Sequence, residues 1–267
     1  MLDENLNDDV KTMDRYSPEE RQRLILDLLQ SHNKVMATEL ASQLGATEAT
    51  IRRDLRYLAD AGLCKRIHGG ALSFAPPSGT QEERLSNRSS EKQALALAAL
   101  KIIKKGQLIF LDASSTHMML ASILPDNLAL TVVTNSPAIA SRLLERKIIK
   151  TILIGGELDY AVGGAIDITA AEAIQKFRFD VSFMGVCAWS SEVGFSAIHY
   201  RDREFKRTVV LRSGATAVLC TDDKIEALAS FPFMSSTELD YLVCTENDST
   251  LNHHFSELGC HVISVTL

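Results

Sequence analysis

Residues 47–70 read TEATIRRDLRYLADAGLCKRIHGG, and this stretch predicts a helix followed by a short hairpin. Thr47 is a typical residue before a helix, because its hydroxyl oxygen accepts a hydrogen bond from an N–H of the first turn. Ile51, Leu55 and Leu58 follow at helical spacing and predict one apolar stripe that faces a core. The first part of the stretch is therefore expected to be an amphipathic helix.

The other faces of this helix and the hairpin after it are basic. Gly62 is suited to end the helix, and LCKRI then predicts a strand that turns at His68-Gly69-Gly70 and returns at Ala71-Leu72. A basic helix followed by a basic hairpin is typical of a recognition helix with a wing, so we expect binding to duplex DNA. The expected DNA-binding residues are Thr47, Thr50, Arg52, Arg53 and Arg56 from the helix, with Lys65, Arg66 and His68 from the wing.

A run such as Arg52-Arg53-Asp54, taken alone, is more often the solvated face of an ordinary helix than a DNA-binding surface. The preceding residues favour the DNA-binding interpretation. Ser17-Pro18-Glu19-Glu20 predicts a helix start with a capping box, and 38–44 predicts a short second helix at helix-turn-helix spacing from the third. Which residues contact bases and which contact phosphates stays open. An alternative role for Asp54 is an ion pair that orients a neighbouring arginine.

Composition changes divide the chain of 267 residues into two expected domains. Residues 1–14 are acidic and poor in large apolar groups, which indicates a disordered tail. Residues 15–74 form the predicted winged helix-turn-helix domain. The Pro-Pro-Ser-Gly segment opens a predicted linker over residues 75–90, and an α/β domain is expected over residues 91–267.

The second domain alternates apolar strands with helices. Buried strands are predicted at 108–112, 128–134, 151–155, 181–186, 216–220, 241–245 and 261–265. Helices are predicted at 137–147, 169–177, 200–212 and 251–258, and a longer one from about Glu82 or Ser90 to Lys105. This pattern predicts a doubly wound, mostly parallel sheet covered on both faces.

Charge is unevenly distributed along the chain. The formal net charge is −6, yet residues 15–74 hold nine Lys and Arg against seven acidic residues. Phosphate attraction depends on a local basic face rather than on whole-chain charge, so the acidic total does not exclude DNA binding.

The sequence predicts a cytoplasmic protein without a membrane span. The five cysteines are scattered and none forms a CxxC pair, which favours reduced thiols. The N-terminus is acidic, unlike a signal peptide, and no run of 18 apolar residues is present. No nucleotide-binding motif stands out, and His253-His254 is expected on a surface helix rather than at a metal. We therefore expect no cofactor and no metal.

The N-terminal motifs resemble those of the DeoR family of bacterial repressors. TIRRDL stands at Thr50–Leu55 and R-x-HGGA at Arg66–Ala71, and VTN, GGEL and a Lys-Arg pair follow in the family's order. The resemblance implies a bacterial repressor that binds operator DNA as a homo-oligomer, a dimer or a tetramer. It further implies that residues 91–267 form an effector-sensing and oligomerisation domain, related in fold to sugar-phosphate isomerases and responsive to a phosphorylated sugar or related metabolite.

Several polar segments follow the predicted strands at the ends where α/β sheets bind ligands. Asp112-Ala113-Ser114-Ser115-Thr116 opens a helix, whose free N–H groups form either an anion site or an ordinary cap. Lys206 and Lys224 are candidates to neutralise a phosphate, although single lysines are often surface charges. With the positions that the resemblance adds, the expected effector residues are Asp112, Ser114, Ser115, Thr116, Thr134, Asn135, Gly155, Gly156, Lys206 and Lys224.

Three positions depart from the pattern of the family. Ser114 replaces a glycine, Asp202 replaces a glutamate, and Thr221 replaces an aspartate. These changes leave the identity of the sugar open and weigh against isomerase chemistry, which needs a positioned carboxylate base.

The leading interpretation is a transcriptional regulator that is not an enzyme. One alternative is a sugar-phosphate isomerase or hydrolase with an appended DNA-binding domain, and another is a C-terminal domain that serves only for oligomerisation. His117 is expected to pack at a helix start. Trp189 and Phe195 are expected to cover a pocket, to pack in the core or to form an oligomer contact.

Overall fold

The computed structural model describes residues 15–75, 79–146, 148–245 and 249–266. The chain divides into two compact units, the first ending at Phe74 and the second beginning at Ala75. Residues 1–14, for which a disordered tail is predicted, lie outside the described residues.

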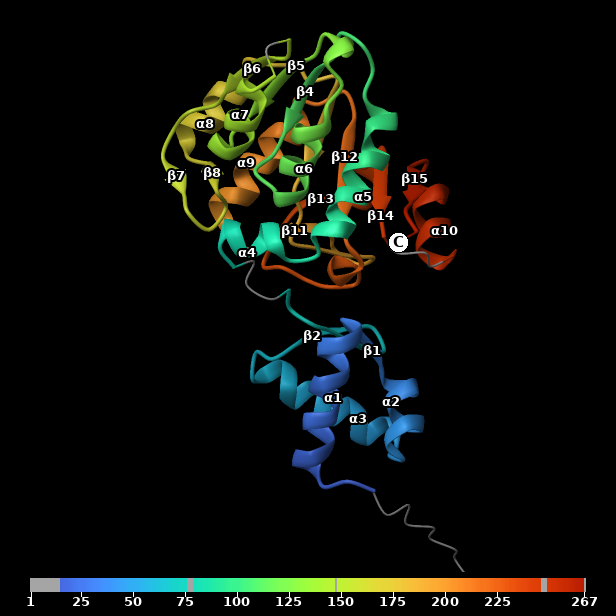
Figure 1. The fold of residues 1–267 in the computed structure, drawn as a ribbon. Coiled ribbons are helices and arrows are strands. Elements are labelled where there is room, and N and C mark those ends of the chain that lie inside the picture. The colour runs from blue at the N-terminus through green and yellow to red at the C-terminus, as the bar shows by residue number, and fades with distance from the viewer. Residues whose placement is uncertain (1–14, 76–78, 147, 246–248, 267) are drawn as a thin grey trace, which may run out of the picture. The chain divides into compact units, whose positions relative to one another are not determined.

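The first unit combines helices with a small antiparallel sheet (Figure 1). Its described elements are α1 (Pro18–His32), β1 (Lys34–Met36), α2 (Ala37–Leu44), α3 (Glu48–Asp60), β2 (Lys65–Ile67) and β3 (Gly70–Leu72). The strands lie in the order β1-β3-β2, so β1 extends the β2-β3 hairpin. The sequence did not predict β1, because three residues are too few to show strand alternation. The predicted helix-turn-helix and wing are both present.

Apolar residues from all three of these helices form the core of the first unit. Ile51, Leu55 and Leu58 of α3 are at most 2% exposed and pack against Ile25 and Leu29 of α1. The capping box predicted at the start of α1 is present, because the Ser17 side chain accepts from the Glu20 backbone and Glu20 accepts from the Ser17 backbone. The predicted apolar stripe of α3 is thus its buried face.

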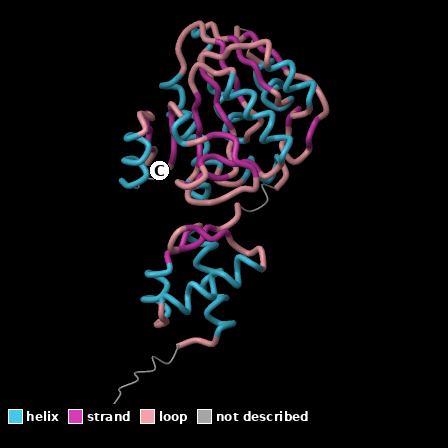
Figure 2. Tube along the Cα trace, turned by 180° about the vertical axis from the view of Figure 1, so that it is seen from behind, coloured by secondary structure: helices cyan, strands magenta, loops and turns pink. Residues whose placement is uncertain are grey.

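The second unit is organised around a seven-stranded parallel sheet. The strands are β4 (Leu108–Leu111), β5 (Thr131–Thr134), β6 (Lys150–Leu153), β9 (Val181–Met184), β12 (Thr216–Cys220), β14 (Tyr241–Cys244) and β15 (His261–Ser264). They lie in the order β15-β14-β12-β9-β4-β5-β6, and every neighbouring pair is parallel. All seven correspond to predicted strands, and Figure 2 shows the sheet between helices from behind.

Helices cover both faces of this sheet, as the doubly wound prediction requires. One face packs against α5 (Ser89–Ala99), α6 (Ser115–Ile123) and α7 (Pro137–Leu144), and the other against α8 (Ile168–Ile174), α9 (Tyr200–Leu211) and α10 (Ser249–Glu257). Alternate strand residues supply the two cores, since Phe110 of β4 belongs to one and Ile109 and Leu111 belong to the other.

The order of the strands creates a switch point in the middle of the sheet. From β4 the chain proceeds through β5 and β6 to one edge, and β9, β12, β14 and β15 then proceed to the other edge. The connections after β4 and β9 therefore diverge at the carboxyl end of the sheet. A crevice forms at such a point and is the usual ligand site of open α/β sheets.

Several elements of the second unit were not predicted. An antiparallel sheet of β10 (Ala188–Ser190), β11 (Gly194–Ala197) and β13 (Phe231–Met234) lies beside the main sheet, and β7 (Leu158–Asp159) pairs with β8 (Gly164–Ala165). The helix predicted from about Glu82 or Ser90 to Lys105 has two breaks: the first separates α4 (Gln81–Ser86) from α5, which starts close to the second predicted position, and a 3-10 turn, Leu100–Ile102, ends it early. Arg88 causes the first break, because its left-handed backbone (φ 53°) interrupts the helical ladder. The segment predicted as a linker thus carries α4.

Candidate DNA-binding surface and ligand cavity

The outer face of α3 carries exposed arginines. Thr47 caps the helix and accepts from the Thr50 backbone at 3.2 Å, as expected from the sequence. Arg52, Arg53 and Arg56 are exposed, and Arg52 donates to Glu48 one turn earlier at 2.7 Å. These guanidinium groups are free of the core and available to a ligand.

Asp54 faces inward, away from these arginines. Its Oδ2 lies 2.5 Å from Nε of Arg21 on α1, and its Oδ1 accepts from Gln22 at 3.1 Å. The predicted ion pair therefore exists, but its partner comes from α1 rather than from the same helix. Asp54 joins the first helix to the recognition helix.

The wing presents a second basic surface. Lys65, Arg66 and His68 are exposed on the β2 side of the hairpin. Gly70 is required by close packing, since a Cβ there would lie 2.1 Å from the Val35 carbonyl oxygen of β1. The glycine of the HGGA motif therefore permits the sheet that holds the wing.

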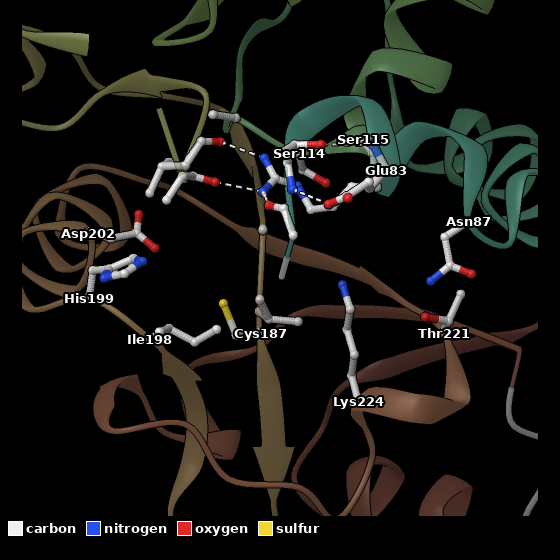
Figure 3. Close-up of a pocket in the computed structure, with 18 of the residues that line it drawn as sticks. Glu83, Asn87, Ser114, Ser115, Cys187, Ile198, His199, Asp202, Thr221 and Lys224 are labelled. Atoms are coloured by element: carbon white, nitrogen blue, oxygen red, sulfur yellow. Dashed lines mark hydrogen bonds between the residues drawn. The ribbon is translucent and has the colours of Figure 1, made fainter. Parts of the chain in front are cut away.

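A cavity of about 830 Å³ opens at the switch point of the second unit (Figure 3). Its walls come from α4, α5, the start of α6, the turn after β9, the start of α9 and the turn after β12. The principal polar and charged residues of the wall are Thr80, Glu83, Arg84, Asn87, Arg88, Lys92, Ser114, Ser115, His199, Asp202, Lys206, Thr221, Asp223 and Lys224.

The N-terminus of α6 forms one wall of this cavity. Ser114 caps the helix and accepts from the Thr116 backbone at 3.2 Å. Its backbone is extended (φ −152°, ψ 143°), so the serine that replaces the family's glycine is accommodated without strain. Asn135 fixes the loop, because its Oδ1 accepts from the Ala113 backbone at 3.0 Å. The N-terminal N–H groups and dipole of α6 favour an anion at this wall.

A buried charge cluster forms the floor of the cavity. Nζ of Lys206 contacts Oδ2 of Asp112 and lies 3.0 Å from Oδ1 of Asp202. Burial raises the pKa of Asp202 to about 6, although Lys206 opposes the shift. Burial lowers the pKa of Lys206, but the two carboxylates outweigh it and the net shift is upward. Lys206 is therefore positively charged and already neutralised by its neighbours.

Lys224 differs from Lys206 in its surroundings. It follows β12 in a 3-10 turn, Asp222–Lys224, and extends into the cavity opposite Ser114 and Ser115 (Figure 3). Among the described residues, no carboxylate forms an ion pair with it. Lys224 is therefore a cation that an anionic ligand can reach.

Two family models match the chain. The model of the DeoR-like helix-turn-helix domain matches residues 21–76, and that of the DeoR C terminal sensor domain matches residues 87–246. The second match alone spans more than half of the chain. The chain belongs to the DeoR family.

Relatives of this DeoR-family protein are named as regulators. GolR, an HTH-type transcriptional regulator of Listeria innocua, is 30% identical over 92% of this chain and 98% of its own. The glycerol-3-phosphate regulon repressor of Escherichia coli is 29% identical over 73% of this chain and 77% of its own. The repressor GlcR of Bacillus subtilis is 28% identical over 90% of this chain and 92% of its own. The protein is a DNA-binding transcriptional regulator with a C-terminal sensor domain, as predicted.

More distant likenesses exist among solved structures. Ribose 5-phosphate isomerase A from Methanocaldococcus jannaschii matches 52% of this chain and 55% of its own, with a TM-score of 0.39 and 15% identity. So distant a likeness carries no conclusion about activity. Within the described part of the DeoR-family protein, no helix is long and apolar enough to cross a membrane.

Four of the ten predicted effector residues line the cavity: Ser114, Ser115, Lys206 and Lys224. The other six do not, for reasons that the tertiary structure makes clear. Asp112 is fully buried behind Lys206, which it contacts, and Thr116 is buried within α6. Thr134 accepts from the Ser136 backbone at 3.1 Å, and Asn135 holds the Ala113 loop. Gly155 and Gly156 follow β6, which is the edge strand and lies away from the switch point.

The sequence did not identify the remaining walls of the cavity. One wall contains three residues in or beside the segment predicted as a linker: Arg84, Arg88 and Lys92. Another contains Cys187, which lies in the turn after β9, and His199, which comes directly before α9. Periodicity cannot show which part of a sheet a short helix covers.

Three residues with open roles are placed in the core. Trp189 and Phe195 are buried and pack against Phe255, which makes them ordinary packing residues. His117 is fully buried at the start of α6, as expected, with Nδ1 2.8 Å from the Asp112 carbonyl oxygen. Burial lowers its pKa to about 4, so the ring is neutral at pH 7.

The histidine pair on α10 is divided between solvent and core. His253 is exposed and lies 3.2 Å from Glu257, whereas His254 packs against Trp189. Within the described residues, no cluster of three His, Cys, Asp or Glu side chains is arranged to hold a metal.

Proposed function

We propose that this DeoR-family protein is a repressor that leaves its operator when a phosphorylated sugar or related metabolite binds in the cavity of the second unit. One arrangement carries the proposal: the N-terminus of α6, with Ser114 and Ser115, faces Lys224 across the cavity. A helix N-terminus and an opposing ammonium group supply the N–H donors and the positive charge that a phosphate requires.

The distribution of ion pairs supports this position for the phosphate. Lys206 is bound by two carboxylates, and Arg88 is bound by Glu91, Asp222 and Asp223. Lys224 forms no ion pair within the described residues. A phosphate beside Lys224 and Ser115 therefore gains a charge-assisted contact without breaking an existing ion pair.

The size of the cavity fits a small polar ligand. About 830 Å³ lies within the range of roughly 300–1,000 Å³ that is usual for ligand pockets. The relative from Escherichia coli is named for a glycerol-3-phosphate regulon, which supports a phosphorylated metabolite as the ligand class.

The first unit supports operator binding through its exposed basic residues. We propose that Thr47, Thr50, Arg52, Arg53 and Arg56 of α3 enter the major groove, and that Lys65, Arg66 and His68 of the wing contact the backbone or the minor groove. In a homo-oligomer, a dimer or a tetramer, two such units would bind the two half-sites of an operator in the cytoplasm. An effector then lowers affinity by favouring an arrangement that no longer matches their spacing.

The alternative of an isomerase or hydrolase requires a carboxylate that is free to act as a base. The two candidates, Asp112 and Asp202, both contact Lys206 in the floor of the cavity. This engagement favours a binding site over a catalytic one. Turnover of sugar phosphates by the full chain, abolished by Asp202→Asn, would favour the enzyme instead.

The decisive experiment compares thermal stability and operator binding in the presence of a panel of sugar phosphates. We expect at least one member to raise the Tm of the wild-type protein and to lower its DNA affinity. Lys224→Met should lose both responses, whereas Lys176→Met, which replaces an exposed lysine outside the cavity, should keep them. If no phosphorylated metabolite changes either quantity, the sensor half of the proposal is wrong.

A further inference from the structure

Helix α4 forms a wall of the cavity although it comes soon after the DNA-binding unit in the chain. The first unit ends at Phe74, and α4 spans Gln81–Ser86. Glu83, Arg84 and the following Asn87 line the cavity. Residues 79–87, which come soon after the DNA-binding unit in the chain, therefore contribute to the same cavity wall as α6 and Lys224.

Arg84 links α4 by hydrogen bonds to the loop between β7 and β8 on the cavity wall. Its Nη1 donates to the carbonyl oxygens of Gly79 at 2.9 Å and Ala161 at 2.6 Å, and its Nη2 donates to that of Val162 at 3.0 Å. All these acceptors are neutral backbone groups. A guanidinium group has more N–H donors than these bonds use, so donors remain for a ligand.

Lys92 of α5 forms hydrogen bonds to the C-terminal end of α4. Its side chain is buried, and Nζ donates to the carbonyl oxygens of Arg84 and, at 2.7 Å, of Asn87. Burial lowers the pKa of Lys92 to about 8, with smaller contributions from the nearby cations Lys224, Arg84 and Arg88, while Asp223 opposes the shift. One proton of the ammonium group is left after these two bonds.

Arg84 and Lys92 are both cations without a carboxylate partner in the part of the chain that the structure describes. Neither Arg84 nor Lys92 forms an ion pair within the described residues, and both line the cavity with Lys224. A hydrogen bond from a cation to an ionised oxygen adds the attraction between opposite charges to the charge-assisted bond, which a neutral carbonyl oxygen does not offer. An anion in the cavity would satisfy the remaining donors of both side chains and reduce their mutual repulsion.

We propose that Arg84 and Lys92 bind the anionic group of the effector, and that the bound effector thereby clamps α4 onto the rest of the second unit. The inference rests on the proposed function, because it assumes that a phosphorylated ligand occupies this cavity. A clamped α4 restricts the segment that follows the DNA-binding unit. Restricting α4 gives the effector a route along the chain to the DNA-binding unit that needs no new contact between the units.

The first test measures the affinity of the full chain for inorganic phosphate by thermal shift and 31P NMR. Arg84→Gln should weaken phosphate binding about tenfold or more, because a charge-assisted contact is lost. Arg212→Gln is the matched control: Arg212 also donates to backbone carbonyl oxygens, those of Phe177 and Gln175, but lies outside the cavity. Its phosphate affinity should stay within about twofold of wild type.

The second test measures hydrogen exchange of the backbone amides of residues 82–88. Phosphate should slow this exchange in the wild-type protein and in Arg212→Gln, but not in Arg84→Gln. Arg84→Lys, which keeps the charge but loses the planar fork, serves if Arg84→Gln fails to fold, and it should show weakened phosphate binding. One result would overturn the inference: an Arg84 variant whose amides exchange faster without phosphate but which binds phosphate as tightly as wild type. Arg84 would then have only a structural role.

The outcomes separate this inference from the proposed function. If phosphate binds the wild-type protein and Lys224→Met loses it while Arg84→Gln keeps full affinity, the effector site stands and the clamp is wrong. If the wild-type protein binds neither phosphate nor any sugar phosphate, the proposed function fails and the clamp fails with it.

Discussion

Arg21 of α1 and Asp54 of α3 form a buried ion pair, with Nε and Oδ2 2.5 Å apart and both side chains 4% exposed. Asp54 stands within the TIRRDL motif, between the arginines that face outward. The motif therefore serves two purposes on opposite faces of one helix. Its arginines are exposed, as the proposed DNA contacts require, and its aspartate fixes the helix against α1.

Asp54→Ala should destabilise the first unit by about 3–5 kcal/mol, because it leaves the Arg21 guanidinium buried without its carboxylate. Urea unfolding followed by circular dichroism measures the change. Asp60→Ala, at the exposed end of the same helix, should change the free energy of unfolding by less than about 0.5 kcal/mol. Equal stability of the two variants would show that the pair does not hold α3.

Arg52→Ala, Arg53→Ala and Arg56→Ala should each weaken DNA binding by about 1–3 kcal/mol while the fold stays intact. Their side chains are exposed, and the Arg52–Glu48 surface pair contributes little to stability. Fluorescence anisotropy with a fragment selected by the wild-type protein measures the loss. Arg23→Ala, an exposed arginine of α1, is the control and should bind nearly as wild type.

The salt dependence of DNA binding distinguishes phosphate contacts from base contacts. We expect a steep loss of affinity with added salt in the wild-type protein, because bound phosphates release counterions. Replacing a phosphate-binding side chain such as Lys65 should lower the slope of log K against log salt by about one. A flat response of the wild-type protein would contradict binding dominated by phosphates.

Ser114→Gly restores the residue that the family pattern carries, and it should bring no gain. Ser114 already adopts an extended backbone and caps α6 through the Thr116 backbone. The glycine variant should lose a few tenths of a kcal/mol of stability and Ser114→Ala about 1 kcal/mol. Thermal unfolding measures both. A clear increase in phosphate affinity for the glycine variant would show that the serine restricts the site.

Asp202 should make the stability of the second unit depend on pH. Burial raises its pKa from 3.8 to about 6 in the folded protein, although Lys206 opposes the shift. Because the folded state holds this proton more tightly than the unfolded state, the contribution is fully present below pH 4. It is lost as the pH rises through about 6.

Asp202→Asn removes this titration and provides the comparison. Between pH 4 and pH 7, the free energy of unfolding of the wild-type protein should fall by roughly 2 kcal/mol relative to the variant. Chemical unfolding at each pH measures the difference, and other titrating groups cancel between the two proteins. A constant difference across this range would place the proton elsewhere in the cluster with Lys206.

Local sequence patterns were enough to predict the main helices and strands of this protein and which side chains of α3 are exposed. The stripe of Ile51, Leu55 and Leu58 predicted the buried face of α3, and the arginines between them necessarily point outward. The seven apolar strands were recognisable because both faces of a parallel sheet are covered. Such features depend on neighbours a few positions away, which a sequence displays directly.

Only the tertiary structure decided which residues meet. The partner of Asp54 lies 33 positions earlier, and the partner of Lys206 at Asp112 lies 94 positions earlier. Gly155 and Gly156 follow a strand like the other candidates, but the strand order places β6 at the sheet edge. Arg84 of α4 and Lys92 of α5 reach the cavity because both helices pack against α6. These juxtapositions arise from strand order and helix packing, which no local periodicity encodes.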